Sequence, residues 1–164
     1  MYKNMRHFVL FAISLIMAAC SSLSSTERAE RAAKVAQSVE KALAGRRYTV
    51  SINTMFPRNG RVVNVSPDYS VKVKGDTLVS YLPYFGRAYN VPYGGGKGYN
   101  FTAPITDYQA TKNRKGNTRI TFRTNNEEDI LTFMLDVFPD GSTTIDVTAR
   151  ERESISYSGQ MDVE

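Results

Sequence analysis

Histidine, cysteine and tryptophan are almost absent from this sequence. Its 164 residues contain one histidine (His7), one cysteine (Cys20) and no tryptophan. Nucleophilic catalysis of the Ser-His-Asp or Cys-His type needs a histidine or a free thiol in the folded domain, and zinc sites are built largely from the same two residue types. Beyond position 20, the sequence therefore excludes these sites and any disulfide within the chain. Carboxylate pairs, Ser-Lys arrangements and calcium bound by oxygen atoms remain open.

The N-terminus has the pattern of a bacterial export signal. Lys3 and Arg6 precede an apolar run at 8–19, which is shorter than the roughly 20 residues of a membrane-spanning helix. The run ends in Met17-Ala18-Ala19-Cys20, which resembles a lipobox, the motif that lipoprotein signal peptidase reads. We therefore expect residues 1–19 to be a lipoprotein signal peptide that is removed. The alternative is an ordinary secretory signal followed by an incidental cysteine.

Lipidation would make Cys20 a membrane anchor, because each buried methylene of its acyl chains adds about 0.8 kcal/mol of membrane binding. We expect residues 20–26 to form the lipidated cysteine and its tether, and residues 27–164 to form a single domain with one core. Ser21 follows the cysteine, without an aspartate or an acidic run. This favours the outer membrane and the periplasmic side.

Charge argues against a nucleic-acid partner. The formal net charge of +5 falls to about +3 without the two signal-peptide cations, and the basic residues are not gathered in one stripe. A nucleic-acid reader normally carries a concentrated basic footprint. We therefore expect the membrane, reached through Cys20, as one partner, with an envelope protein or a glycan as a further candidate.

One helix is predicted over residues 26–44. Small apolar residues recur there at three- and four-residue spacings, and Glu27 stands three residues after Ser24, as in a capping box. Gly45 is a plausible C-terminal stop. The apolar face is alanine-rich and thin, so we expect the helix to pack closely against a sheet; the alternative is an extended stalk.

From Tyr48 onward the apolar period is two, which is typical of strands. The strand residues are Tyr48, Val50, Ile52, Val71, Val73, Leu78, Leu82, Ile120, Phe122, Leu131, Phe133, Leu135, Val137, Ile145, Val147, Ile155 and Tyr157. The intervening turn sequences are Asn59-Gly60, Lys74-Gly75-Asp76, Lys115-Gly116-Asn117 and Pro139-Asp140-Gly141. Short turns of this kind predict antiparallel pairing. We expect a mainly β domain, an antiparallel sandwich or incomplete barrel of about eight strands with one N-terminal α-helix.

Residues 81–101, the Tyr-rich segment, interrupt this strand pattern. Six of the ten tyrosines lie between positions 81 and 108, and the segment also contains two prolines and a triple glycine. The glycines lack the spacing and the hydroxyl of a phosphate-binding P-loop. Tyrosine combines a broad apolar face with a polar rim, which suits both binding surfaces and closed loops. The candidate ligand or partner contacts are Tyr84, Arg87, Tyr89, Tyr93 and Lys97.

Two charged runs invite functional interpretations. Five oxygen-bearing side chains occupy 125–129, but calcium needs six to eight oxygen ligands and the EF-hand spacing is missing; we expect a solvated hairpin tip. Charges alternate in sign over 150–153, on a predicted strand; we expect a solvated edge. The remaining carboxylates show no spacing that singles out a glycosidase pair. We predict no catalytic residue, metal site or cofactor.

Three parts of the sequence carry a family resemblance. They are the run YLPYFGRAY at 81–89 with Pro92, Tyr93 and Phe101, the pair Asp140-Gly141, and the run ISYSG at 155–159. On these residues the chain resembles domain-of-unknown-function family 4251, found in small Bacteroides-type lipoproteins, over about residues 33–160. The resemblance implies an envelope location and a single domain. It implies no activity, so no catalytic or binding residue is carried over.

The expected function is that of a non-enzymatic envelope lipoprotein that binds a ligand or partner through the Tyr-rich segment. A structural or assembly role, with the aromatic side chains of the segment in the core, is the alternative. A carboxylate-based hydrolase ranks third. Exposed tyrosines would favour the first interpretation and buried ones the second.

Overall fold

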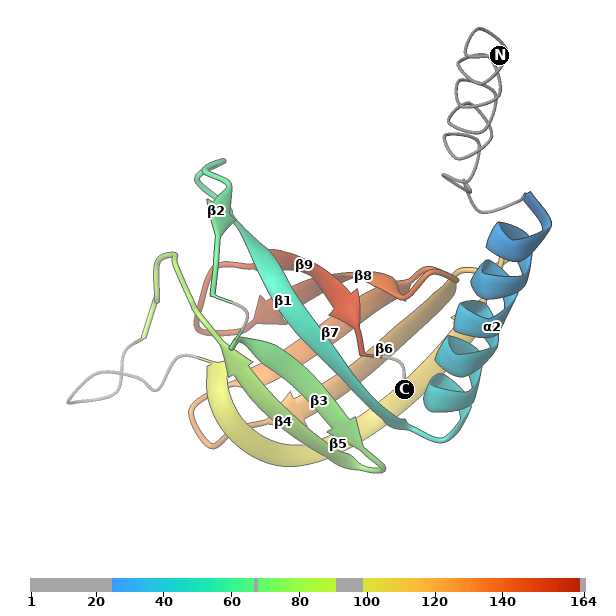
Figure 1. Ribbon diagram of the computed structural model, residues 1–164. Helices are drawn as coiled ribbons and strands as arrows, with labels where there is room; N and C mark the ends of the chain where they lie inside the picture. Colours follow the sequence, from blue (N-terminus) through green and yellow to red (C-terminus); the bar gives the residue numbers. More distant parts are fainter. Residues whose placement is uncertain (1–24, 67, 91–98, 163–164) are drawn as a thin grey trace, which may run out of the picture. The chain divides into compact units, whose positions relative to one another are not determined.

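The computed structural model describes residues 25–66, 68–90 and 99–162 (Figure 1). The predicted signal peptide and Cys20 lie outside this part of the chain. The chain divides into two compact units, residues 1–33 and 34–164, and the fold below is that of the second. Its described elements are α2 (Ser25–Ala44, which begins in the first unit), β1 (Arg47–Pro57), β2 (Val63–Asn64), β3 (Ser70–Lys74), β4 (Thr77–Leu82), β5 (Tyr99–Lys112), β6 (Thr118–Asn125), β7 (Ile130–Val137), β8 (Ser142–Ala149) and β9 (Ile155–Met161).

The strands form one antiparallel sheet that closes on itself. Neighbours in the sheet follow chain order from β3 to β9, with β1 beside β3 and the short β2 added to β1. Closure comes from pairing of β1 with β9, from Val50 opposite Met161 to Pro57 opposite Ile155. The prediction of a mainly β, antiparallel domain with an N-terminal helix is confirmed. The prediction of a sandwich or incomplete barrel is wrong, because the last strand returns to the first and leaves an eight-stranded barrel with β2 outside it.

Large side chains fill the barrel interior. Phe122 and Phe133 face each other across β6 and β7 with ring centroids 5.2 Å apart, and both are fully buried. Eight strands give an interior that side chains can just fill. The apolar residues that the sequence placed on strands are buried, for example in β7, where those at 131, 133, 135 and 137 are all buried.

The second half of α2 packs against the barrel, as the sequence predicted. Val39 is buried in the core, and Val35, Ala42 and Leu43 pack against it. An ion pair of 2.7 Å joins Glu40 to Lys112 at the end of β5. We call this the helix end of the barrel. α2, the helix of the described part of the chain, is not long and apolar enough to cross a membrane.

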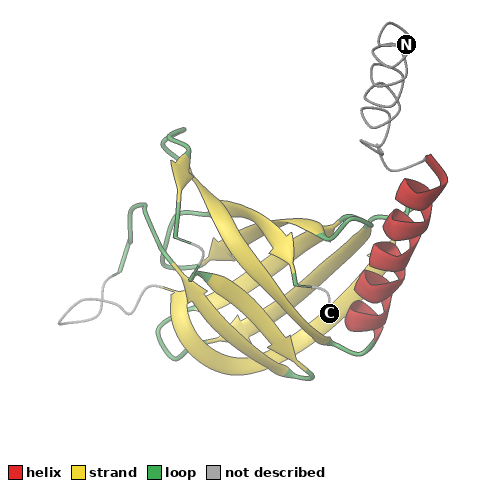
Figure 2. Ribbon diagram, viewed as in Figure 1, coloured by secondary structure: helices red, strands yellow, loops and turns green. Residues whose placement is uncertain are grey.

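The opposite end, the distal end, is where β1, β4, β6 and β8 finish (Figure 2). It carries the connection from β4 to β5, the hairpin from β6 to β7 and the connection from β8 to β9. These three segments come from distant parts of the sequence. Barrel closure brings them together, and they form the candidate site.

Candidate functional site

The Tyr-rich segment lies at the distal end, and its two ends belong to strands. Tyr81 is the penultimate residue of β4, and Tyr99 is the first residue of β5. The sequence therefore predicted too long an interruption of the strand pattern. Tyr99 is fully buried, and its backbone carbonyl accepts a hydrogen bond of 2.7 Å from Ser80 Oγ. The described part that leaves the barrel is 83–90.

Backbone hydrogen bonds hold residues 83–90 against the connection from β8 to β9. Tyr89 N donates to Glu151 O at 2.7 Å, and Glu153 N donates to Arg87 O at 3.0 Å. The carboxylate of Glu153 also accepts a bond of 3.1 Å from Arg87 N. Ala88 therefore faces Arg152 as in a short antiparallel bridge. This part of the segment is fixed by its neighbour.

The side chain of Tyr84 stabilises residues 83–90 through contacts within the segment and with the barrel. Its hydroxyl donates to Arg87 O at 2.8 Å, and its ring meets the ring of Tyr99 edge-on with centroids 5.1 Å apart. The fully buried Tyr157 donates to Pro83 O at 2.7 Å. Burial raises the pKa of the Tyr84 hydroxyl, and the nearby charge of Glu153 raises it further. Tyr84 is half-buried and serves the packing of the segment.

Arg152 lies beneath this segment as a buried cation. Its side chain is only 7% exposed and forms an ion pair of 3.0 Å with Glu128. The guanidinium carbon also lies 5.5 Å from the ring centroid of Tyr84 and 5.8 Å from that of Tyr99. A buried guanidinium needs this compensation for its lost hydration, both from a carboxylate and from aromatic faces. Arg152 thereby joins the hairpin from β6 to β7 to the aromatic segment.

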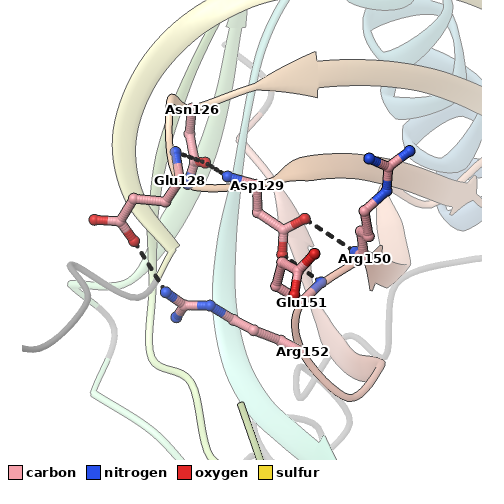
Figure 3. A network of polar contacts seen from close by, with 6 residues as sticks. All are labelled: Asn126, Glu128, Asp129, Arg150, Glu151 and Arg152. Atoms are coloured by element: carbon pink, nitrogen blue, oxygen red, sulfur yellow. Dashed lines mark hydrogen bonds and ion pairs between the residues drawn. The ribbon is translucent and has the colours of Figure 1, made fainter. Parts of the chain in front are cut away.

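Asp129 links the hairpin from β6 to β7 to the connection from β8 to β9 (Figure 3). Its carboxylate accepts 3.0 Å hydrogen bonds from the backbone N–H groups of Arg150 and Glu151. Within the hairpin, Asn126 Oδ1 accepts a bond of 2.8 Å from Asp129 N. The carboxylate thus provides acceptors for two backbone N–H groups of the connection from β8 to β9. Such charge-assisted bonds to backbone amides are among the stronger hydrogen bonds in proteins.

These contacts correct two predictions. The run 125–129 is not a fully solvated hairpin tip, because Asp129 is buried. The run 150–153 is not a solvated strand edge: it belongs to the connection between β8 and β9, and Arg152 is buried within it. The runs exchange an ion pair and two hydrogen bonds across more than 20 positions of sequence. The sequence of either run, taken by itself, does not indicate that the other run is its partner.

The three connected segments form a surface that we call the distal platform, defined as residues 83–90, 125–130 and 150–154. Phe85 and Tyr89 are 64% and 68% exposed on it. Six of the seven large hydrophobic side chains that are exposed in the described part of the chain lie at the distal end. They are Phe56, Val62, Tyr81, Phe85, Tyr89 and Ile130.

A family model described as a domain of unknown function, DUF4251, matches residues 30–161. The chain belongs to the DUF4251 family. The predicted resemblance is therefore confirmed. The chain is also similar in structure to a crystallised DUF4251 family protein from Bacteroides eggerthii DSM 20697, with a TM-score of 0.62 and 18% identity, over 80% of this chain and 89% of that one. At this identity the likeness concerns the fold alone. Comparison with curated protein sequences gave no match.

Of the five residues predicted to contact a ligand or partner of this DUF4251 protein, the three that the structure describes differ in their exposure to solvent. Arg87 and Tyr89 are exposed on the distal platform, whereas the side chain of Tyr84 is partly buried against the core. Tyr93 and Lys97 lie outside the described residues. Sequence reasoning missed Phe85, although it stands in the same aromatic run. It also missed the supporting role of Arg152, for which the sequence offers no local signal.

Two buried hydroxyls of the DUF4251 barrel have no hydrogen-bond partner among the described residues, those of Tyr99 and Thr124. Burial raises the pKa of Tyr99 above its ordinary value, and the hydroxyl of Tyr84 adds to this effect. Within residues 25–66, 68–90 and 99–162, no three acidic, histidine or cysteine side chains are grouped so as to hold a metal ion. The distal platform presents the exposed side chains of Phe85, Arg87 and Tyr89.

Proposed function

We propose that this DUF4251 protein is a cell-envelope lipoprotein, anchored through Cys20 in the outer membrane and facing the periplasm. It binds a partner protein or another envelope ligand through the distal platform, without catalysing a reaction. The lipobox-like sequence before Cys20 supports the anchor. The exposure of Phe85 and Tyr89 on a hydrogen-bonded support carries the binding role.

The physical basis of this proposal is preorganisation. Water-exposed aromatic side chains on a mobile loop would lose conformational entropy on binding, and that loss weakens affinity. Here Tyr89 N and the carbonyl of Arg87 are already engaged by the connection from β8 to β9. The aromatic rings therefore project from a backbone that is fixed before any partner arrives. Aromatic residues and arginine are also the residue types that dominate binding energy at interfaces.

The filled barrel interior supports binding at the surface over binding inside the barrel. Barrels that carry a ligand inside need an interior left open by small side chains. In this barrel, Tyr99, Tyr157 and Phe122 are fully buried in the interior. The clustering of exposed apolar side chains at the distal end is the pattern expected of a contact surface.

A structural role is the second candidate, and the packing of Tyr84 and Tyr99 favours it. Both rings lie against the cation of Arg152, and Tyr99 is fully buried. These tyrosines close one end of the barrel, so the Tyr-rich segment contributes to the core as well as to the surface. The two roles separate by residue: Tyr84 and Tyr99 support the fold, and Phe85 and Tyr89 make the contact.

Site-specific photo-crosslinking in cells tests the binding role. A photoreactive phenylalanine analogue at Phe85 or Tyr89 is expected to give a discrete crosslinked product. The matched control is the same substitution at Phe138, which is 37% exposed but lies at the helix end. Equal crosslinking at all three positions, or none at Phe85 and Tyr89, would contradict the proposal.

The anchor has a separate test. Metabolic labelling with a radioactive fatty acid is expected to label the wild-type chain and not the Cys20→Ala variant. Fractionation should then place the labelled protein in the outer membrane, shielded from protease added to intact cells. Persistent labelling of Cys20→Ala would rule out Cys20 as the lipidated residue, without affecting the crosslinking result.

A further inference from the structure

A basic groove lies at the helix end of the barrel, between the last turn of α2 and the outer faces of β1 and β3. It has a volume of about 840 Å³ and is lined by Lys41 of α2, Arg47 of β1, Lys72 and Lys74 of β3, and one acidic residue, Asp162. All lining residues belong to the unit 34–164. The groove is therefore a property of the barrel and the half of α2 packed on it.

The strand register places like charges side by side in this groove. Arg47 on β1 is directly opposite Lys74 on β3. Both side chains project from the outer face, since the intervening residues of each strand are buried. Two like charges in direct cross-strand opposition are destabilising. Packing and barrel closure do not require a cation at either of these exposed positions.

Among the described residues, the groove cations lack the ion pairs that several other cations of the barrel form. Elsewhere, Arg46, Lys112 and Arg119 each form an ion pair of 2.7–2.9 Å with an acidic side chain. Within the described part of the chain, Lys41, Arg47, Lys72 and Lys74 form none, and these four line one groove.

The polar groups between these cations complete the site. Ser38 and Thr49 line the same groove and provide hydroxyl donors. Asp162 accepts hydrogen bonds of 3.0 and 3.2 Å from Ser51 Oγ, so its carboxylate is engaged by β1. Convergent lysine, arginine and hydroxyl donors are the groups that hold phosphate oxygens.

We propose that this groove binds a phosphate-bearing anion, with Lys72 and Lys74 as its principal contacts. Bound phosphate oxygens relieve the repulsion between Arg47 and Lys74, because each cation then has a nearby negative charge. The site is separate from the distal platform, which lies at the other end of the barrel. The phosphate comes either from a soluble molecule or from a lipid headgroup.

Titration of the full chain with two probes tests the proposal. Inorganic pyrophosphate represents a soluble phosphate, and dihexanoylphosphatidylglycerol, kept below its micellar concentration, represents a lipid headgroup. We expect saturable binding of at least one probe. The titration is monitored through changes in the amide chemical shifts of β1 and β3. The double substitution Lys72→Ala/Lys74→Ala should weaken that binding about tenfold or more, because hydrogen bonds to charged groups contribute strongly.

The matched control is Arg114→Ala/Lys115→Ala, which removes two exposed cations from the turn between β5 and β6. It should leave the affinity unchanged, as should the charge-retaining Lys72→Arg/Lys74→Arg. Thermal unfolding without ligand should show that Lys72→Ala/Lys74→Ala is at least as stable as wild type. The probe that binds the wild type and whose binding is weakened in Lys72→Ala/Lys74→Ala identifies the phosphate source. Absence of binding by both probes, or equal weakening in the groove and control variants, overturns the proposal.

Discussion

At the residue scale, barrel closure depends on Gly159. A Cβ built at this position would lie 2.1 Å from the carbonyl oxygen of Ser51 and 2.9 Å from its carbonyl carbon. Both are backbone atoms of β1, and the register of β1 against β9 shifts between Ile52 and Thr54 at this point. A side chain cannot move aside here without moving a strand. Glycine is therefore required by close approach of two backbones.

Gly159→Ala is expected to lower the free energy of unfolding by about 3 kcal/mol or more, because overpacked sites with no flexible neighbour relax poorly. Urea denaturation followed by circular dichroism measures this. Gly45→Ala is the matched control, since its Cβ would meet only ordinary contacts, the nearest atom being Lys41 O at 3.4 Å. A similar loss of stability in both variants would show that close approach of β1 and β9 is not the cause.

Arg152→Met is expected to destabilise the protein, because it removes a buried guanidinium that pairs with Glu128 and lies over the rings of Tyr84 and Tyr99. The change keeps much of the side-chain volume but leaves Glu128, which is only 20% exposed, without its guanidinium. Breaking such a pair costs about 3 kcal/mol, the lower end of the range for buried pairs. Arg123→Met is the control: its pair with Asp107 is 3.8 Å long and well exposed, so about 0.5 kcal/mol or less is expected. Equal losses in denaturant unfolding would contradict a special role for Arg152.

At the element scale, the sequence was informative wherever the cause of structure is local. The helix over 25–44 follows from apolar spacing and a stop at Gly45, and β7 follows from strict alternation. β5 was missed, although it is the longest described strand. Beyond Ile105 its residues are mostly polar and exposed, and Asp107 interrupts it with a φ of 53° at a bulge. Periodicity cannot identify a strand whose alternation is broken in this way.

Tyr84→Phe tests whether the hydroxyl of Tyr84 holds the backbone of residues 83–90 in place. The variant loses the hydrogen bonds from the Tyr84 hydroxyl to Arg87 O and, at 3.3 Å, to Glu153 O, but keeps the ring contact with Tyr99. One such bond contributes about 1 kcal/mol, so hydrogen exchange at the amides of Arg87 and Tyr89 should become about fivefold faster. Exchange in β7 should not change.

Tyr81→Phe is the matched control for this experiment. Tyr81 stacks on Tyr69 at a centroid distance of 5.1 Å, and its hydroxyl forms no hydrogen bond with the described residues. It should leave the exchange of Arg87 and Tyr89 unchanged. Faster exchange in both variants would mean that the aromatic rings, and not the Tyr84 hydroxyl, hold the segment.

At the scale of the whole molecule, closure is the property that sequence reasoning could not supply. The pairing of β1 with β9 joins residues about 100 positions apart, for example Ile52 and Gly159. Local turn and strand patterns predict hairpins, and hairpins fit a sandwich, an open barrel or a closed one equally well. The candidate site depends on the same closure. The aromatic run at 81–89 was visible, but its support by Arg152 arises only when the sheet returns on itself.

The closed barrel also makes a prediction about alkaline pH. Burial raises the pKa of Tyr48, Tyr99 and Tyr157 above its ordinary value, with smaller effects from neighbouring tyrosines. A group whose pKa is raised in the folded state stabilises that state fully below its unfolded pKa, about 10 for tyrosine. Its stabilisation is lost as the pH rises above that value, because the unfolded chain can then release the proton.

We therefore expect stability to fall steeply above about pH 10 and part of the tyrosinate absorbance to appear only as the barrel unfolds. Parallel titrations by ultraviolet absorbance and circular dichroism measure both events. Tyr157→Phe should reduce the absorbance step that accompanies unfolding, since one buried hydroxyl is removed. Complete ionisation of the tyrosines while the circular dichroism of the β-sheet is still intact would show that these hydroxyls exchange protons with water in the folded protein.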